Sequence, residues 1–261
     1  MIDDDARGDA RVQRDPWQAL RRLTPARIAL GRVGASLPTA EVLRFGLAHA
    51  QAQDAVQRPF DAQGLVSRLE ADGWATLGVA SRAATRERYL LRPDLGRRLD
   101  DASAARLGGL AASAHAAPEL VFVAADGLSS LAAERHAPAL LAALRPLLPR
   151  GRRIGPIVVA RQARVALGDE IGERLGAGLV VMLIGERPGL SSPDSLGLYL
   201  THAPRVGRVD AERNCISNVR AEGLAPQRAA ARLAWLVTES MRRGMSGVRL
   251  KEASAAADTA S

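Results

Sequence analysis

Short apolar runs that end in polar or glycine-containing turns recur through the second half of this chain, from about residue 117 onward. Segments with helical spacing of apolar residues lie between these runs and after the last one. Continuous apolar runs that alternate with helices are typical of a parallel sheet buried on both faces. The sequence therefore predicts an α/β fold, a parallel sheet covered by helices. The expected strands are 120–125, 154–160, 178–184, 196–201 and 215–219, and the expected helices are 131–148, 169–175 and 226–243.

The first hundred residues lack this alternation and are predicted to be mostly helical. A helix is expected to begin at Thr39, a favourable N-cap residue, and to continue to Val56. A short hairpin is expected around residues 74–91. The patterns divide the chain into four parts. These are a flexible segment 1–20 that is a candidate targeting tag, a helical region 21–115, a sheet domain 116–252 and a disordered tail 253–261.

Composition excludes several classes of protein. Apolar residues make up 47% of the chain, but no apolar stretch reaches the roughly 18 residues that a membrane span needs. The polar segment Met1–Asp15 does not have the pattern of a secretory signal. Cys215 is the only cysteine, so neither an internal disulfide nor a cysteine-rich zinc site can form. We therefore expect a protein of the reducing cytoplasm, with no membrane association.

The chain is basic, with 36 Lys and Arg residues against 28 Asp and Glu residues and a net charge of +8. Lys251 is the only lysine, and the arginines are dispersed rather than gathered in a stripe. Aromatic residues, which stack on bases in single-stranded nucleic-acid sites, make up only 3%. We expect no nucleic-acid partner. The arginines are expected to form a solvated face or a surface for an acidic protein.

Motifs for several common chemistries are missing. The turn after residue 125 has no Gly-x-Gly-x-x-Gly fingerprint, and the chain has no Walker motif. Ser129 and Ser130 do not lie in a Gly-x-Ser-x-Gly elbow. The spacing of His and acidic residues does not indicate a metal site. The sequence predicts a binding fold with no catalytic residue and no metal of its own.

Three segments follow or overlap the expected strands and are rich in small or hydrogen-bonding residues: 126–129, 185–190 and 214–218. Ligands of open α/β sheets bind beyond the carboxyl ends of the strands, so these segments are the candidate site. Glu186 directly follows an apolar strand, and a partly buried carboxylate needs a partner. That partner is either an arginine such as Arg187 or an amide of a bound ligand. Cys215 is by type most often a small apolar packing residue.

Several strings of residues are similar to those of the small (light) subunit of ethanolamine ammonia-lyase, in the same order from about residue 24 to 251. The rarest are Met-Leu-Ile-Gly-Glu-Arg-Pro-Gly-Leu at 182–190, Ser-Pro-Asp-Ser-Leu-Gly at 192–197 and Glu-Arg-Asn-Cys-Ile-Ser-Asn-Val-Arg at 212–220. Others are Arg-Ile-Ala-Leu-Gly-Arg-Val-Gly-Ala-Ser-Leu-Pro-Thr at 27–39 and Ala-Arg-Val-Ala-Leu-Gly-Asp-Glu-Ile-Gly at 163–172. The N-terminus and residues 59–110 carry no such string.

The resemblance implies one subunit of an adenosylcobalamin-dependent lyase, which converts ethanolamine to acetaldehyde and ammonia by a radical rearrangement. It implies a Rossmann-like domain with a helical N-terminal part. This domain covers the cobalamin at the interface with a large subunit that holds the substrate and most catalytic groups. Six copies of each chain are expected in a heterododecamer. The expected location is the bacterial cytoplasm, and the family is often associated with a microcompartment.

The cofactor contacts that the resemblance implies are Val165, Glu186 and Cys215, and all three lie in intact motifs. Cys215 is expected to contact the cofactor rather than to act as a nucleophile or redox group. The Asp-x-His-x-x-Gly signature of base-off binding is absent, so a base-on cofactor is expected. A second hypothesis is a non-catalytic α/β interaction module that binds an acidic partner through its arginines.

Overall fold

A computed structural model describes residues 12–253 of the chain. Residues 1–11 of the candidate tag and residues 254–261 of the expected tail lie outside the described residues. The chain divides into two units: unit 1 is Met1–Asp54 with Gly189–Pro193, and unit 2 is Ala55–Pro188 with Asp194–Ser261. Unit 2 contains the entire sheet.

Within residues 12–38, the described part of unit 1 that precedes its long helix contains little regular structure. A short 3-10 helix, η1 (Gln18–Arg22), lies across the end of the segment 1–20 that was expected to be flexible. The isolated bridges Gln13↔Arg32 and Val33↔Ser36 fold the following loop back on itself. Helix α1 (Thr39–Gln57) begins where the sequence predicted it. Its last residues belong to unit 2.

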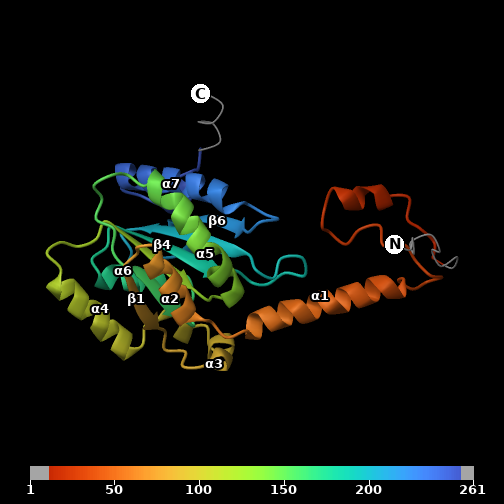
Figure 1. The fold of residues 1–261 in the computed structure, drawn as a ribbon, viewed down its shortest axis with the longest axis horizontal. Helices are drawn as coiled ribbons and strands as arrows, with labels where there is room; N and C mark the ends of the chain where they lie inside the picture. Colours follow the sequence, from red (N-terminus) through yellow and green to blue (C-terminus); the bar gives the residue numbers. More distant parts are fainter. Residues whose placement is uncertain (1–11, 254–261) are drawn as a thin grey trace. The chain divides into compact units, whose positions relative to one another are not determined.

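The sheet of unit 2 has six strands in the order β1-β3-β2-β4-β5-β6. Figure 1 shows it with β1 near the bottom, β4 in the middle and β6 near the top. The four strands β1, β3, β2 and β4 are mutually parallel, whereas β5 runs antiparallel to both β4 and β6. The sheet is therefore mixed, and the expectation of a parallel sheet is wrong for β5. The strands are β1 (Thr76–Ala80), β2 (Leu120–Ala125), β3 (Ile157–Arg161), β4 (Leu179–Gly185), β5 (Leu196–His202) and β6 (Arg213–Val219).

The expected hairpin at 74–91 is also wrong. Its first arm is β1, which pairs with β3 in register Thr76↔Ile157 rather than with a neighbouring segment. Its second arm lies in helix α3 (Arg86–Leu91), where Thr85 accepts a hydrogen bond from the Arg88 N–H as N-cap. The sheet therefore recruits its edge strand from the region that the sequence indicated to be helical.

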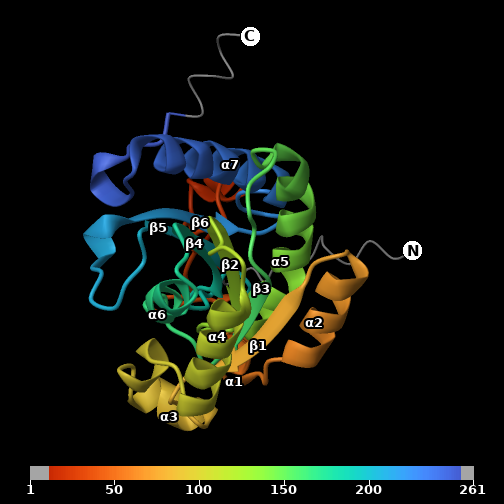
Figure 2. The same ribbon diagram turned by 90° about the vertical axis from the view of Figure 1, so that its left-hand side faces the viewer.

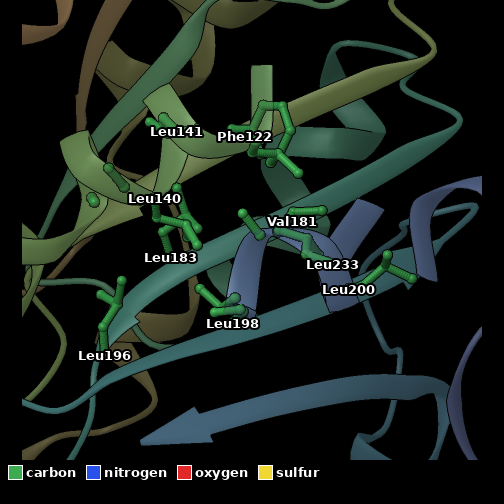
Figure 3. Close-up of a cluster of buried hydrophobic side chains, with 14 of the residues drawn as sticks. Phe122, Leu140, Leu141, Val181, Leu183, Leu196, Leu198, Leu200 and Leu233 are labelled. Atoms are coloured by element: carbon green, nitrogen blue, oxygen red, sulfur yellow. The ribbon is translucent and has the colours of Figure 1, made fainter. Parts of the chain in front are cut away.

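Helices cover both faces of the sheet, and alternate residues of the central strands pack against them (Figure 2). Leu120 and Phe122 of β2 point to the face covered by α2 (Ala62–Ala71), α5 (Ser130–Leu144) and α7 (Pro226–Arg243). Figure 3 shows this cluster, in which Phe122 of β2 lies on the same face of the sheet as Val181 of β4 and the leucines of α5, β4 and β5. Val121 and Val123 point to the other face, which α4 (Asp101–Ser113) and α6 (Leu167–Arg174) cover.

Local sequence signals explain the helix ends. Helix α7 starts with Pro226 and ends at Gly244, which adopts the left-handed conformation (φ +65°) common after a helix. The helix expected at 131–148 ends at Leu144, and Pro146 lies in the 3-10 turn η3 (Arg145–Leu147). The other short 3-10 turns are η2 (Leu95–Arg97), η4 (Asp210–Glu212) and η5 (Gly247–Arg249).

No helix within residues 12–253 is long and apolar enough to cross a membrane. In the same residues, no three His, Cys, Asp or Glu side chains are grouped so that they could hold a metal ion.

Candidate cofactor site

A cavity of about 410 Å³ lies at the carboxyl ends of the parallel strands β2, β3 and β4. Ligands of open α/β sheets bind beyond these carboxyl ends of the strands. Its walls come from the turns after β2 and β3, from the end of β4, from α3 and from β5. The lining residues are Tyr89, Gly127, Leu128, Arg164, Val165, Ile184, Gly185, Glu186, Arg187 and Tyr199.

Glu186 directly follows β4 and is held by the neighbouring strands. Its backbone N–H donates to the Ser195 carbonyl at 2.9 Å. Its carboxylate accepts from the Ser195 hydroxyl and, at 3.1 Å, from the Asn218 N–H. A Cβ at Gly197 would lie 3.0 Å from both Cγ and Oε1 of Glu186, so a glycine opposite gives this side chain its space. The carboxylate is therefore fixed in the cavity wall, with acceptor capacity left for a ligand.

Val165 lies on the turn after β3, half-buried against the α6 side of the core. Its neighbour Arg164 donates through its backbone N–H to the Gly96 carbonyl at 2.8 Å and through Nη2 to the Tyr89 carbonyl at 3.2 Å. The Arg164 Nε is buried and has no hydrogen-bond partner within the described part of the chain. A buried donor without a partner is costly to the folded state.

Tyr89 forms the floor between two arginines. Its ring lies 4.3 Å from the Arg164 guanidinium carbon and 4.8 Å from that of Arg86, both within cation–π range. Its hydroxyl donates to the Ala163 carbonyl at 3.0 Å. Burial is the main cause that raises the pKa of Tyr89, so the phenol stays protonated and remains a donor.

Asp126 lies behind the cavity rather than in its lining. It directly follows β2, and its carboxylate accepts from the backbone N–H groups of Gly127 (2.9 Å), Gln162 (2.8 Å) and Ala163 (3.0 Å). Arg86 Nη1 is 3.7 Å from the Asp126 carboxylate. Burial raises the pKa of Asp126, and the three N–H donors and Arg86 oppose that rise.

Cys215 lies on β6, directly opposite Tyr199 of β5. The residue as a whole is exposed, but its thiol is partly buried and is hydrogen-bonded to the Tyr199 side chain. Burial of the sulfur is the largest cause that raises the pKa of Cys215, and the nearby Glu186 charge adds to it. The raised pKa keeps the thiol protonated at neutral pH, which disfavours a role as nucleophile.

Comparison with known proteins gives a consistent result. The sequence model of the family "Ethanolamine ammonia-lyase light chain" matches residues 14–251. That match covers far more than half of the chain. The chain belongs to the ethanolamine ammonia-lyase light chain family.

Curated relatives agree with this assignment. The chain is 57% identical to the ethanolamine ammonia-lyase small subunit of Ralstonia nicotianae, across 97% of this chain and 94% of the relative. It is 57% identical to the small subunit of Azotobacter vinelandii (91% and 88% covered) and 55% identical to that of Xanthomonas campestris (92% and 88% covered). As a light-chain family member, the chain is a component of a lyase.

The structure brings together two of the three site residues that the resemblance to the ethanolamine ammonia-lyase light chain implied. Val165 and Glu186 both line the cavity. Cys215 does not line it, but is linked to it through Tyr199. Of the segment 214–218, Asn218 contacts Glu186, whereas Asn214 bonds the Gly247 and Leu250 carbonyls, away from the cavity.

Sequence reasoning missed Tyr89, Arg164 and Tyr199 as lining residues. Arg164 directly precedes Val165 in a matching motif, which was an available signal. Tyr89 and Tyr199 are the only two tyrosines in the chain. Residue type alone does not tell whether a tyrosine lines a binding site or packs in the core.

Proposed function

We propose that this chain is the cobalamin-binding small subunit of an adenosylcobalamin-dependent ethanolamine ammonia-lyase, which converts ethanolamine to acetaldehyde and ammonia. The cavity at the carboxyl ends of β2, β3 and β4 is the observation that carries the proposal. It combines an apolar wall with a fixed carboxylate and a buried arginine N–H that has no partner in residues 12–253.

The residues of the cavity suit one edge of a corrin ring. The rim of that ring carries amide groups, which both donate and accept hydrogen bonds. Glu186 supplies an acceptor and Arg164 Nε a donor, while Val165 and Ile184 supply apolar contact. A cavity of about 410 Å³ is too small to enclose a whole cobalamin, so a second chain must complete the site. We propose that this chain is the large subunit.

In this proposal the chain's residues bind and orient rather than catalyse. Glu186 would accept a hydrogen bond from an amide N–H of the cofactor, and Val165 would pack on the cofactor's apolar face. Cys215, which lies opposite Tyr199 on β6, would contact the cofactor beside the cavity. When bound, adenosylcobalamin supplies the radical that starts the rearrangement. We propose that the cofactor would bind base-on, because the sequence lacks the Asp-x-His-x-x-Gly signature of base-off binding.

The proposed assembly is six small and six large subunits, with ethanolamine bound mainly by the large subunit. We propose that the sheet of unit 2, which includes β1 from the region 21–115 as well as the strands of 116–252, is a Rossmann-like cofactor platform. We further propose a bacterial cytoplasmic location within a microcompartment, with residues 1–20 as a targeting tag.

The first test is activity of the co-purified pair. The chain and its large subunit are supplied with adenosylcobalamin and ethanolamine, and acetaldehyde is followed, with each chain alone as control. Activity from the pair only is the expected result. A pair that assembles and binds cobalamin but leaves ethanolamine untouched would overturn the substrate while leaving the cofactor site standing.

The second test targets the cavity. Glu186→Ala removes the acceptor, so we expect about 10-fold or greater loss of cobalamin affinity in an assembled pair. Glu119→Ala is the matched control. Glu119 also accepts from a backbone N–H, that of Arg153, and from a side chain, that of Arg152, but it precedes β2 and so lies at the amino ends of the strands, away from the cavity. Equal cobalamin affinity of the two variants would remove Glu186 from the site.

A further inference from the structure

We infer that Asp126 is a positioning residue that sets the shape of the cofactor cavity without touching the cofactor. The inference rests on the proposed function and adds to it a residue behind the cavity wall. Its basis is a single buried carboxylate whose hydrogen bonds join two of the walls.

The two walls are separate segments of the chain. Gly127 and Leu128, directly after Asp126, form the wall that follows β2, and Arg164 and Val165 form the wall that follows β3. Parallel strands leave such turns unconnected by sheet hydrogen bonds. The Asp126 carboxylate accepts from the first residue of one wall segment and from the two residues that precede the other. The distance between the walls therefore depends on this side chain.

The backbone at Gln162 explains why a carboxylate is needed there. Gln162 has a φ of +54°, in the left-handed region that non-glycine residues rarely adopt. Such a conformation persists only when its surroundings fix it. The Asp126 carboxylate accepts the Gln162 N–H, and the Ser81 hydroxyl donates to the Gln162 carbonyl. Asp126 thus stabilises the strained turn that presents Arg164 and Val165 to the cavity.

Arg86 holds the other side of the carboxylate. Its Nη1 donates to the Gly127 carbonyl at 2.7 Å and lies 3.7 Å from the Asp126 carboxylate, and its Nε donates to the Val56 carbonyl. Asp126 is only 1% exposed and does not line the cavity. It therefore acts on a ligand only through the two walls.

A second buried carboxylate in the same unit provides a matched control. Asp169 is also 1% exposed, but it forms a bidentate pair with Arg213, which begins β6 at the edge of the sheet away from the cavity. Asp169 has no hydrogen bond to either cavity wall among the described residues. We expect its replacement by asparagine to remove comparable buried charge without changing the cavity walls, because its carboxylate bonds Arg213 and not those walls.

The experiment compares Asp126→Asn with Asp169→Asn in the full chain co-purified with the large subunit. Cyanocobalamin binding gives the Kd, adenosylcobalamin titration gives kcat and the cofactor KM, and thermal unfolding monitors stability. An asparagine keeps one acceptor oxygen and turns an N–H toward a backbone donor. We expect the Asp126→Asn Kd and cofactor KM to rise about 10-fold or more, as for other residues that orient a binding group, with kcat unchanged at saturating cofactor. Asp169→Asn should lower the unfolding temperature and leave the Kd unchanged.

A further variant tests the link to Gln162. Glycine adopts a φ of +54° without strain, so Gln162→Gly removes the need for Asp126 to hold the turn. In the Gln162→Gly background, Asp126→Asn should therefore raise the cobalamin Kd by a smaller factor than it does alone. If Asp126→Asn alone does not fold, the double variant is compared directly with Gln162→Gly. Failure of both to fold would show a global structural role and would overturn the inference.

The remaining outcomes separate the two proposals. An unchanged Kd in Asp126→Asn, or an equal rise in Asp169→Asn, overturns the role of Asp126 while the cofactor site stands. If the wild-type pair binds no cobalamin, the proposed function fails. Hydrogen exchange of the Gln162 and Ala163 amides then tests whether Asp126 fixes the wall after β3. Loss of their protection in Asp126→Asn but not in Asp169→Asn supports the positioning role. Equal protection in both variants overturns it.

Discussion

Units 1 and 2 use their apolar residues in opposite ways. Unit 2 buries Tyr89, Phe122 and most of its leucines completely, on both faces of its sheet. Unit 1 leaves Trp17 at 67%, Leu23 at 82% and Leu43 at 68% exposure. No large apolar side chain of unit 1 is buried within the described residues. The difference indicates that unit 2 is stabilised by its own core, whereas the contacts described in unit 1 are mainly local hydrogen bonds and the Glu41 ion pairs with Arg21 and Arg44, which contribute little when exposed.

The largest expected effect is in the core of unit 2. Phe122→Ala removes a fully buried ring from beside Trp74 and Leu141, and we expect a loss of about 3–5 kcal/mol in unfolding free energy. Urea unfolding of the chain measures it. The matched variant in unit 1 is Phe45→Ala, which removes a ring that is exposed, and its loss should be below about 0.5 kcal/mol. Similar losses would contradict the comparison.

The next effect tests whether buried polar groups also stabilise unit 2. Arg213→Met leaves the Asp169 carboxylate buried without its bidentate partner, so the unfolding free energy should fall by about 3 kcal/mol. Arg232→Met, which breaks the exposed pair with Glu252, serves as the control and should cost less than about 1 kcal/mol. An equal cost for both would show that burial does not set the strength of these pairs.

A smaller effect on stability is expected at α1. Leu43→Ser replaces an exposed apolar side chain and should change the unfolding free energy of the isolated chain by less than about 0.5 kcal/mol. The same variant is then mixed with the proposed large subunit and analysed by size-exclusion chromatography. Weakened assembly with unchanged stability is the expected result, because an exposed apolar face gains by being covered by another chain. Unchanged assembly would show that Leu43 does not contact the large subunit.

The smallest effect is the acid dependence of one surface cluster on α7. Hydrogen bonds from Arg242 and Arg243 lower the pKa of Glu239 to about 2, from an ordinary value of 4.5. A lowered folded-state pKa stabilises the folded chain above pH 4.5, and that contribution is lost as the pH falls toward 2. Glu239→Gln should therefore flatten the acid side of the stability profile slightly. Urea midpoints measured across that pH range check it, and an unchanged slope would contradict it.

The strands were predictable from sequence where a continuous apolar run forms a central strand. β2 and β4 match their expected ranges because both of their faces are buried. The direction of β5 was not predicted, because an apolar run looks the same in a parallel and an antiparallel strand. The length of the connection did carry the signal. Residues 186–195 contain no helix and are too short for a parallel crossover, which needs about a dozen residues or more.

The site was predictable only in part. Motif resemblance pointed to Val165, Glu186 and Cys215 as cofactor contacts; the first two line the candidate cavity, and their role as contacts stays a prediction. The pairing of β1 with β3 joins residues about eighty positions apart, so no local pattern indicated it. Strand β1 is followed closely by α3, so the pairing of β1 with β3 also brings α3 and its Tyr89 to the cavity. Sequence periodicity describes neighbours along the chain and does not predict contacts between segments that are far apart in sequence.

The two links between Glu186 and Ser195 have a consequence for the loop between them. The Glu186 N–H bonds the Ser195 carbonyl, and the Ser195 hydroxyl returns to the Glu186 carboxylate, so the intervening loop is closed at its base. Changes beyond a closed base do not propagate into the strands that carry it. A change of conformation confined to Gly189–Pro193 is therefore expected to leave the Glu186 carboxylate where it is.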